Sequence, residues 1–201
     1  MADQKRPYRM KRRAELEEDT RRRITESAAE LHGTLGPTRT SISAIADHAG
    51  VRRSTVYRHF PDEEALFVAC TGHWMASNPF PDLAGWAAIA DPDERLSHAL
   101  DELYAHYRST QGMMANVLRD EALSPLVARM LGGYYDYLAA ARETLMASRT
   151  ARGGARQRTR AALGHALGFT TWRSLTLEQG LNDAQAAELM RRFVTAATRR
   201  G

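Results

Sequence analysis

The chain contains 201 residues, enough to bury one or two hydrophobic cores, and carries a formal net charge of +4 at pH 7. Its single cysteine, Cys70, excludes an intrachain disulfide, and no stretch approaches the roughly 20 apolar residues of a membrane-spanning helix. The first 15 residues are basic but no apolar run follows them, so we identify no signal peptide and expect a cytoplasmic protein.

Basic residues are concentrated in the N-terminal part of the chain. Residues 1–60 contain 13 Lys and Arg against 8 Asp and Glu, whereas residues 61–201 contain 15 against 16. The N-terminal part therefore suits a polyanionic partner such as nucleic acid. Residues 1–15 form a basic N-terminal arm with two open interpretations: a disordered tail, or an arm that contacts phosphates or the minor groove through Arg9, Lys11, Arg12 and Arg13.

Three helices are predicted between residues 16 and 61. The first covers about residues 19–35, and its inward residues are Ile24, Ala28, Leu31 and Leu35. The second begins after Ser41, whose hydroxyl suits an N-cap. It ends near Gly50, because glycine readily adopts the left-handed conformation that turns the chain.

The third helix, predicted over about residues 52–59, has a polar outer face. Val56 and Phe60 lie on its core side, and the opposite side carries Ser54, Thr55, Tyr57 and Arg58. Arginine binds guanine in bidentate fashion, and hydroxyl groups bind phosphate oxygens. Two short helices joined by a glycine turn, the second polar outside, predict a helix-turn-helix that enters a DNA groove.

Residues 62–201 are predicted to form a helical body without strands. A helix follows the Asp62 cap, and residues 78–92 are expected to form a loop that can include a helical turn near Trp86. Further helices cover about 92–107, 111–123 and 125–148. Residues 149–160 are a basic, glycine-containing break, which we interpret as an exposed loop that leads into a helix. Two more helices are expected, over about residues 162–172 and after Asn182.

The last two predicted helices form a candidate association surface. Apolar side chains recur at helical spacing in both, and Gly164 and Gly168 favour close approach of two backbones. Two such helices from each of two copies make a four-helix interface, but the same faces also suit the core of a single chain. The candidate dimerisation residues are His165, Phe169, Trp172, Met190 and Phe193.

Aromatic and methionine side chains on inner helix faces are compatible with a ligand pocket, although such stripes are more often plain core. The candidate ligand-binding residues are Tyr104, Tyr107, Met113, Met114, Leu118, Tyr134 and Trp172. We find no Gly-x-Ser-x-Gly elbow, phosphate-binding glycine loop or His-Glu-x-x-His pair. We therefore expect no catalytic residue, no metal site and no cofactor.

The run from Ser54 to Phe60 (Ser-Thr-Val-Tyr-Arg-His-Phe) follows Ile45-Ala46 and Ala49-Gly50-Val51 and precedes Glu64-Ala65-Leu66. Together with Ile24, Ala28, Leu31, Gly36 and Ser41, this pattern over residues 21–66 resembles the TetR-type family of bacterial transcriptional regulators. Four positions depart from the resemblance. Arg52 replaces the usual Ser or Thr cap and Glu63 a phosphate-contacting Lys or Arg, while His32 and Pro37 replace aromatic residues.

The resemblance implies an all-α fold, with a three-helix helix-turn-helix head and a larger helical body. It also implies a homodimeric repressor that an apolar small molecule releases from a palindromic operator in double-stranded DNA. We divide the chain into the arm at 1–15, the DNA-binding domain at 16–61, and the ligand-binding and dimerisation domain at 62–201. The alternative is a helical protein-interaction module with a degenerate head.

The candidate DNA contacts follow from the predicted outer face of the third helix. We expect base or near-base contacts from Arg53, Ser54, Thr55 and Arg58 and phosphate contacts from Ser41, Tyr57 and His59, with Arg52 able to make either. The expected partners are DNA, a second copy of the chain and a small-molecule effector, with no membrane.

Overall fold

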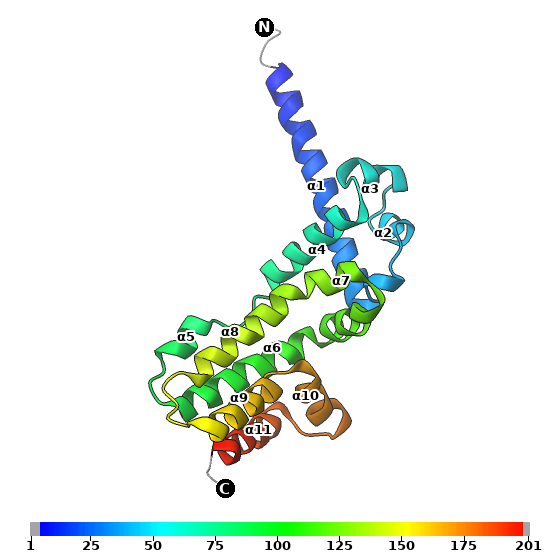
Figure 1. Ribbon diagram of the computed structural model, residues 1–201. Helices are drawn as coiled ribbons and strands as arrows, with labels where there is room; N and C mark the ends of the chain where they lie inside the picture. Colours follow the sequence, from blue (N-terminus) through cyan, green and yellow to red (C-terminus); the bar gives the residue numbers. More distant parts are fainter. Residues whose placement is uncertain (1–4, 199–201) are drawn as a thin grey trace. The chain divides into compact units, whose positions relative to one another are not determined.

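The computed structural model describes the backbone of residues 5–198 and the side chains from residue 10 onward. Every regular element within residues 5–198 is helical (Figure 1), which confirms the predicted all-α fold. In chain order the helices are α1 (Lys5–Thr34), α2 (Ile42–His48), α3 (Arg53–His59), α4 (Glu63–Ser77), α5 (Leu83–Ala88), α6 (Pro92–Asp120), α7 (Pro125–Met130), α8 (Gly132–Met146), α9 (Gly153–Ala166), α10 (Phe169–Arg173) and α11 (Asp183–Thr198). Two 3-10 helices, η1 (Pro37–Arg39) and η2 (Glu121–Leu123), and a π-helical segment, η3 (Ser174–Glu178), complete them. Across the described residues, no helix combines the length and the apolar character that a membrane span requires.

The chain divides into two compact units. The head unit contains α1 to α4, through Asn78, and the segment Ala115–Met130, while the body unit contains Pro79–Met114 and the residues from Leu131 onward. This division differs from the boundary expected at residue 62, because Leu66 and Cys70 of α4 are buried in the same core as Ile24 of α1. The last turn of α6 and all of α7 also belong to the head unit.

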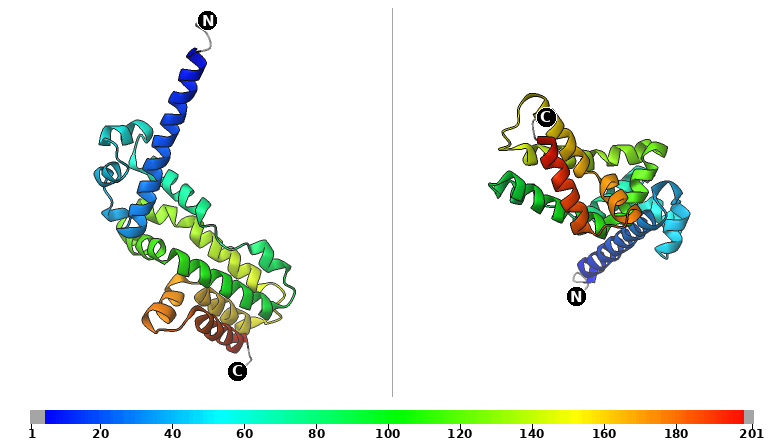
Figure 2. Two further views of the ribbon diagram at one scale, coloured as in Figure 1. Left: turned by 180° about the vertical axis from the view of Figure 1, so that it is seen from behind. Right: turned by 90° about the horizontal axis from the view of Figure 1, so that it is seen from below.

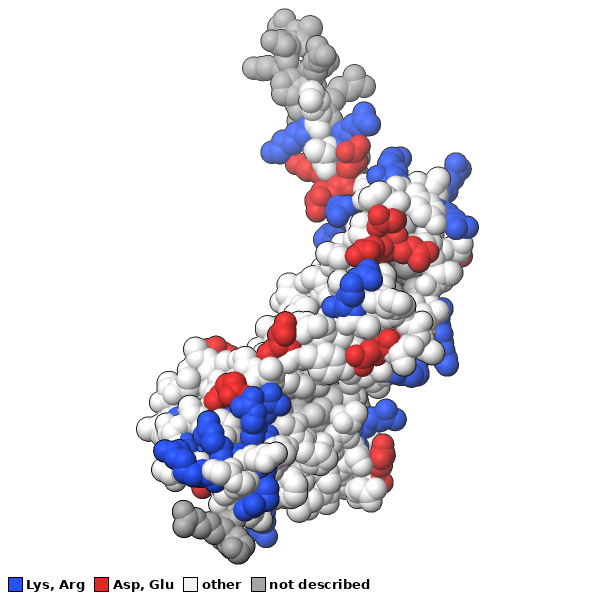
Figure 3. Space-filling view, viewed as in Figure 1, with Lys and Arg blue, Asp and Glu red and all other residues white. Residues whose placement is uncertain are grey.

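Helix α1 begins well before its predicted start near residue 19. It is continuous from Lys5, so the interpretation of a disordered tail is wrong for residues 5–15, while residues 1–4 lie outside the described part. Lys, Arg, Ala, Leu and Glu favour helix here, and Arg13 pairs with Glu17 one turn later at 3.1 Å. The N-terminal half of α1 extends beyond α2 to α4 (Figure 2), and basic side chains precede acidic ones along it (Figure 3).

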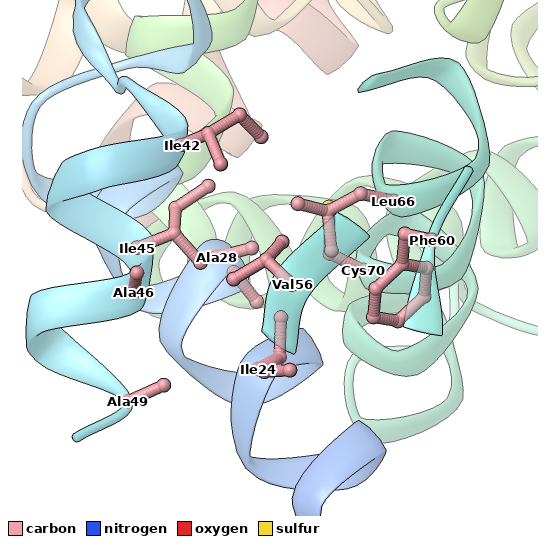
Figure 4. Packing of buried hydrophobic residues seen from close by; sticks show 11 residues of the cluster. Ile24, Ala28, Ile42, Ile45, Ala46, Ala49, Val56, Phe60, Leu66 and Cys70 are labelled. Carbon is pink, nitrogen blue, oxygen red and sulfur yellow. The ribbon is translucent and has the colours of Figure 1, made fainter. Parts of the chain in front are cut away.

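The core of the head unit follows the predicted periodicity. Side chains of α1, α2, α3 and α4 point towards one another (Figure 4), and the buried set is Ile24, Ala28, Ala29, Ile42, Ile45, Ala46, Ala49, Val56, Phe60, Leu66 and Cys70. Leu31 packs against this core as expected. The inward placement of Leu35 was wrong, because α1 ends at Thr34 and Leu35 lies exposed beyond the helical repeat.

Two of the predicted helix boundaries were wrong. The two helices expected between residues 92 and 123 form the single helix α6 up to Asp120, followed by η2, and the hydroxyls of Ser109 and Thr110 donate to the His106 carbonyl without ending the helix. The long helix expected over 125–148 is divided at Leu131 into α7 and α8. Gly132 and Gly133 follow this break, and glycine is a weak helix former.

The C-terminal helices also differ from expectation. The basic break is a loop only to Arg152, because α9 begins at Gly153. Helix α9 ends at Ala166 and α10 begins at Phe169, so His165 and Trp172 lie on different helices. Gly168 is the N-cap of α10, and the amides of Thr171 and Trp172 both bond to its carbonyl at 3.1 and 3.2 Å. The expected stripe over residues 162–172 was therefore not that of one helix.

Candidate nucleic-acid interface

The turn between α2 and α3 has the geometry that the sequence predicts. The Ser41 hydroxyl accepts a bond from the Ala44 amide at 3.1 Å, which confirms the N-cap of α2. Gly50 has a φ of 65°, and the Val51 amide bonds back to the Ala46 carbonyl at 2.9 Å. This left-handed turn satisfies carbonyls at the end of α2 and fixes where α3 begins. Arg52 is the N-cap of α3 without a side-chain cap bond, as expected.

Helix α3 presents one apolar and one polar face. Val56 and Phe60 are each 1% exposed, so they attach the helix to the core. The exposed side chains of α3 and its cap are those of Arg52, Arg53, Ser54, Tyr57 and Arg58, whereas Thr55 and His59 are half-buried. The structure therefore brings together most of the predicted base-contacting groups on one accessible surface, which we call the α3 face.

Arg53 and Tyr57 form a ridge on the α3 face. One Nη atom of Arg53 donates to the Tyr57 hydroxyl at 3.2 Å, and the guanidinium carbon lies 5.5 Å from the ring centre. The two residues are one helical turn apart, so the contact restricts the rotamers of both long side chains. Tyr57 thus orients Arg53 in addition to presenting its own hydroxyl.

His59 is less accessible than the other predicted phosphate contacts. Its Nε2 atom is buried without a hydrogen-bond partner among the described residues. Burial lowers the pKa of His59, and the positive charges of Arg58 and Arg21 lower it further. The imidazole therefore favours the neutral form, which binds phosphate more weakly than an imidazolium. Its phosphate contact stays a prediction.

Two arginines of α1 bond to the ends of α2 and α3, and their roles were not predicted from the sequence. Arg21 donates to the His59 carbonyl at 2.6 Å, and its guanidinium lies 4.2 Å from the Phe60 ring centre. Arg23 donates to the Ala49 carbonyl. These cations lie at the C-terminal ends of α3 and α2, where carbonyl groups lack helical partners. No local spacing reveals these bonds, because they join residues 38 and 26 positions apart.

A second missed element connects the end of α6 to the α1–α2 connection. Asn116 donates to the carbonyls of His32 and Gly33 at 3.2 and 2.8 Å, and Arg119 donates to that of Leu35 at 3.0 Å. The buried Asp120 accepts bonds from the Thr38 amide at 3.0 Å and from Arg119 at 2.8 Å. We call these three residues of α6 the α6 clamp. They satisfy carbonyls at the end of α1 and fix the entry to α2.

Glu63 is exposed in the first turn of α4, directly after the Asp62 cap, whose carboxylate accepts from the Ala65 amide at 2.7 Å. This position is favourable for the helix because a carboxylate complements the positive N-terminal end. The same charge opposes a DNA phosphate, so a phosphate contact at this position of the family pattern is not available from Glu63.

Four predicted ligand-binding residues converge in the body unit. Tyr104, Tyr107 and Trp172 are fully buried and Tyr134 nearly so. Tyr107 donates to the Leu167 carbonyl at 2.7 Å and Tyr104 to that of Ala166 at 2.9 Å, while the hydroxyls of Tyr107 and Tyr134 lie 3.2 Å apart. These phenols therefore hold the C-terminal end of α9, and their polar atoms are satisfied within the protein. Met114 is buried, Met113 is half-buried, and Leu118 belongs to the head unit.

The predicted dimerisation residues fall into two groups. Phe169, Trp172 and Met190 are buried within one chain, and the Trp172 indole donates to Asp183 at 2.9 Å. His165 and Phe193 are exposed and contact each other across α9 and α11, with ring centres 5.9 Å apart. Leu189 lies one helical turn before Phe193 and is 44% exposed, which the sequence analysis missed. We call the exposed surface of His165, Leu189 and Phe193 the α9–α11 face.

The fold and the α3 face together define a helix-turn-helix protein with a helical body. Residues 24–70 match the family model described as "Bacterial regulatory proteins, tetR family", so this segment is a TetR-type helix-turn-helix domain and the predicted resemblance is confirmed. No match was found among curated proteins.

Several solved structures have a similar fold, and each matches most of this chain. A putative TetR-family transcriptional regulator from Mesorhizobium loti is 17% identical, with a TM-score of 0.64 over 90% of this chain and 96% of that one. A putative fatty acid metabolism regulator from Clostridium perfringens is 15% identical, with a TM-score of 0.65 over 89% and 100%. AibR, in complex with isovaleryl coenzyme A and operator DNA, is 20% identical, with a TM-score of 0.62 over 86% and 96%. At these identities the likeness establishes the fold alone.

Proposed function

We propose that this protein is a homodimeric, sequence-specific DNA-binding transcriptional regulator, a repressor that an apolar small molecule releases from a palindromic operator. The observation that carries the proposal is the α3 face, where Arg53, Ser54, Tyr57 and Arg58 are accessible while Val56 and Phe60 anchor the helix. A short helix with one accessible polar face and one buried apolar face suits the major groove, where guanidinium and hydroxyl groups contact base edges.

The residues of the α3 face have different roles in the proposal. Arg58 and Ser54 read bases, and Tyr57 and Ser41 bind phosphates. The basic N-terminal half of α1 adds phosphate contacts through Lys11, Arg12 and Arg13, and these contacts make binding more sensitive to salt. Support comes from AibR, a protein of the same fold whose complex contains operator DNA.

The test of DNA recognition is selection of bound duplexes from a random pool at near-physiological salt. We expect an enriched palindrome. Tyr57→Ala should weaken binding to all duplexes by about tenfold, because it removes a phosphate contact and releases Arg53. Arg58→Ala should instead change the selected sequence, with a loss of about 1–3 kcal/mol at one base pair.

Arg156→Ala in α9 serves as a control that removes one exposed positive charge from a helix outside the α3 face. The same loss on every duplex for Tyr57→Ala and Arg58→Ala would contradict the division of roles. No enrichment from the pool, with only weak salt-sensitive binding, would favour a protein-interaction module with a degenerate head.

The proposed dimer uses the α9–α11 face. Helices α9 and α11 pack against each other within the chain, so two copies related by a two-fold axis place four helices together. Phe193 is 47% exposed and Leu189 44%, and adjacent apolar side chains of this exposure are suited to burial against a second copy. A two-fold dimer presents two α3 faces, which is the reason for expecting a palindromic operator.

Phe193→Glu should convert the dimer to a monomer at micromolar concentration, because it places a carboxylate in the apolar centre of the interface. Sedimentation velocity measures the change, and we expect the dissociation constant to rise at least about 100-fold. Leu123→Glu is the matched control, since Leu123 is 69% exposed and lies in the head unit. A Phe193→Glu protein that remains dimeric would place the interface elsewhere.

We place the effector site near the aromatic residues of the body unit. Buried rings provide flat apolar walls, and Met113 and Met114 adapt to ligands of different shape. Proteins of the same fold are in complex with isovaleryl coenzyme A and with choline, although these ligands belong to those proteins. An effector acts by binding one arrangement of the chain more tightly than the other.

A further inference from the structure

The body unit contains an open cleft that neither the α3 face nor the aromatic core accounts for. Its volume is about 1180 Å³, and its walls come from the start of α6, the segment between α8 and α9, the first turns of α9 and the end of α11. Figure 3 shows basic side chains grouped over this part of the body unit. The cleft includes part of the basic segment 149–160 noted in the sequence. This segment has no role in the proposed function.

Positive charge predominates in the lining of this cleft. Arg149, Arg152 and Arg158 line it, and of the described lining residues only Asp93 carries a carboxylate. Asp93 is already engaged, because Arg149 donates to it at 3.0 Å. Arg149 also donates to the carbonyls of Leu145 and Pro92, so its side chain is 7% exposed and forms a fixed basic wall.

The other two arginines of the cleft are more exposed to solvent than Arg149. Arg152 and Arg158 are both exposed, and among the described residues no carboxylate pairs with Arg152. A guanidinium nitrogen of Arg158 lies 3.4 Å from where a Cβ on Gly154 would be, so this side chain extends along the first turn of α9.

Three further arginines of the body unit do not line this cleft. Arg160 pairs with Glu143 at 2.6 Å, Arg108 pairs with Asp183 at 2.7 Å, and the buried Arg95 donates to backbone carbonyls of four residues. The cleft differs from these sites because three of its cations line one hollow. Hydroxyl groups of Ser148, Thr150 and Thr198 also line it and add neutral donors.

We propose that this cleft binds a small molecule that carries two or more phosphate groups. Planar guanidinium groups match phosphate oxygens in bidentate fashion, and several converging arginines favour a ligand with more than one negative charge. A single phosphate fills only a small part of about 1180 Å³, whereas a ligand of nucleotide size fits it. The site is separate from the aromatic core and does not depend on whether the protein binds DNA.

The test is isothermal titration calorimetry with inorganic tripolyphosphate as the probe, at about 150 mM salt so that diffuse attraction is screened. Orthophosphate and citrate are the comparison ligands, and we expect tripolyphosphate to bind at least about tenfold more tightly than either. Arg152→Ala and Arg158→Ala should each weaken tripolyphosphate binding by about tenfold, as expected for the loss of one charged hydrogen-bonding group.

Arg156→Ala is the matched control, because Arg156 lies on the same helix as Arg158 and is exposed but does not line the cleft. It removes the same charge and should change the affinity less than about twofold. Thermal unfolding of all three variants checks that they fold. An equal loss in Arg156→Ala, equal binding of citrate, or no binding of tripolyphosphate would each overturn the proposal.

Discussion

Replacing Gly36 with alanine should destabilise the head unit by about 3 kcal/mol. Gly36 connects α1 to η1 with a φ of 100° and a ψ of 154°, a backbone conformation that is available almost only to glycine. An added Cβ would overlap one Nη atom of Arg119 and approach Oδ2 of Asp120 to 2.7 Å. The substitution therefore combines backbone strain with a collision against the α6 clamp.

The α6 clamp has no low-energy way to move aside. A shift of Arg119 breaks its bond to the Leu35 carbonyl, and a shift of Asp120 leaves the Thr38 amide without its partner. Burial raises the pKa of Asp120, but the bonds from Arg119 and Thr38 more than offset this and lower the pKa. Asp120 is therefore a buried carboxylate that depends on these donors, and loss of one of them costs about 1–3 kcal/mol.

Urea unfolding followed by circular dichroism measures the effect of Gly36→Ala. Gly72→Ala is the matched control in the same unit, because Gly72 lies in α4 and no atom beyond its chain neighbours and the adjacent helix backbone lies within 4 Å of the position of an added Cβ. Alanine should stabilise this helix position by about 0.5–1 kcal/mol. A Gly36→Ala protein within about 1 kcal/mol of the unchanged chain would show that the connection tolerates a side chain.

His32→Phe should remove part of the acid sensitivity of the head unit. Burial lowers the pKa of His32 to about 4, against a small opposing effect of Asp120. His32 packs against Phe67 with ring centres 5.1 Å apart and the rings tilted by 33°, and its Nδ1 lies 3.5 Å from Sγ of Cys70. The neutral imidazole thus occupies the buried position where the resemblance implies an aromatic residue. Burial also raises the pKa of Cys70, to about 12, so the thiol stays protonated.

The direction of the pH effect follows from proton binding. Between the unfolded pKa of 6.5 and the folded pKa of about 4, the unfolded chain binds a proton at His32 and the folded chain does not. The free energy of unfolding therefore falls as the pH decreases through this window, by about 3 kcal/mol in total. Phenylalanine cannot bind a proton, so the variant lacks this contribution.

Thermal and urea unfolding between pH 7 and pH 4 measure this difference. We expect the stability gained by His32→Phe to grow as the pH falls, up to about 3 kcal/mol at pH 4. His48→Phe is the control, because His48 is exposed and its Nε2 lies 3.5 Å from Glu30. Parallel pH profiles for His32→Phe and the unchanged protein would mean that His32 is accessible to protons in the folded state.

The sequence by itself determined the helix-turn-helix. Its signals are local: Ser41 caps α2, Gly50 turns the chain, and Val56 and Phe60 recur on one side of a short helix. Interactions over three or four residues decide such features, so the residues of α2 and α3 carried enough information to predict the α3 face. The all-α class followed from the same kind of periodicity.

The tertiary structure decided which surfaces the helices bury. Tyr107 and Phe193 both lie on apolar stripes, yet Tyr107 is buried and bonded to the Leu167 carbonyl while Phe193 is exposed. Helical spacing cannot separate these cases, because burial depends on which helices pack together.

Contacts between distant residues were also beyond the sequence. The α6 clamp joins Asn116 to His32 across 84 positions, and the cleft gathers residues from α6, α9 and α11. Arg149 and Arg152 cannot be distinguished by their sequence context, since both lie in one basic segment. In the structure Arg149 is paired with Asp93, whereas Arg152 is exposed beside the cleft. The sequence determined the local geometry of the α3 face, whereas the tertiary structure determined which charges and carbonyls meet, because their partners come from other helices.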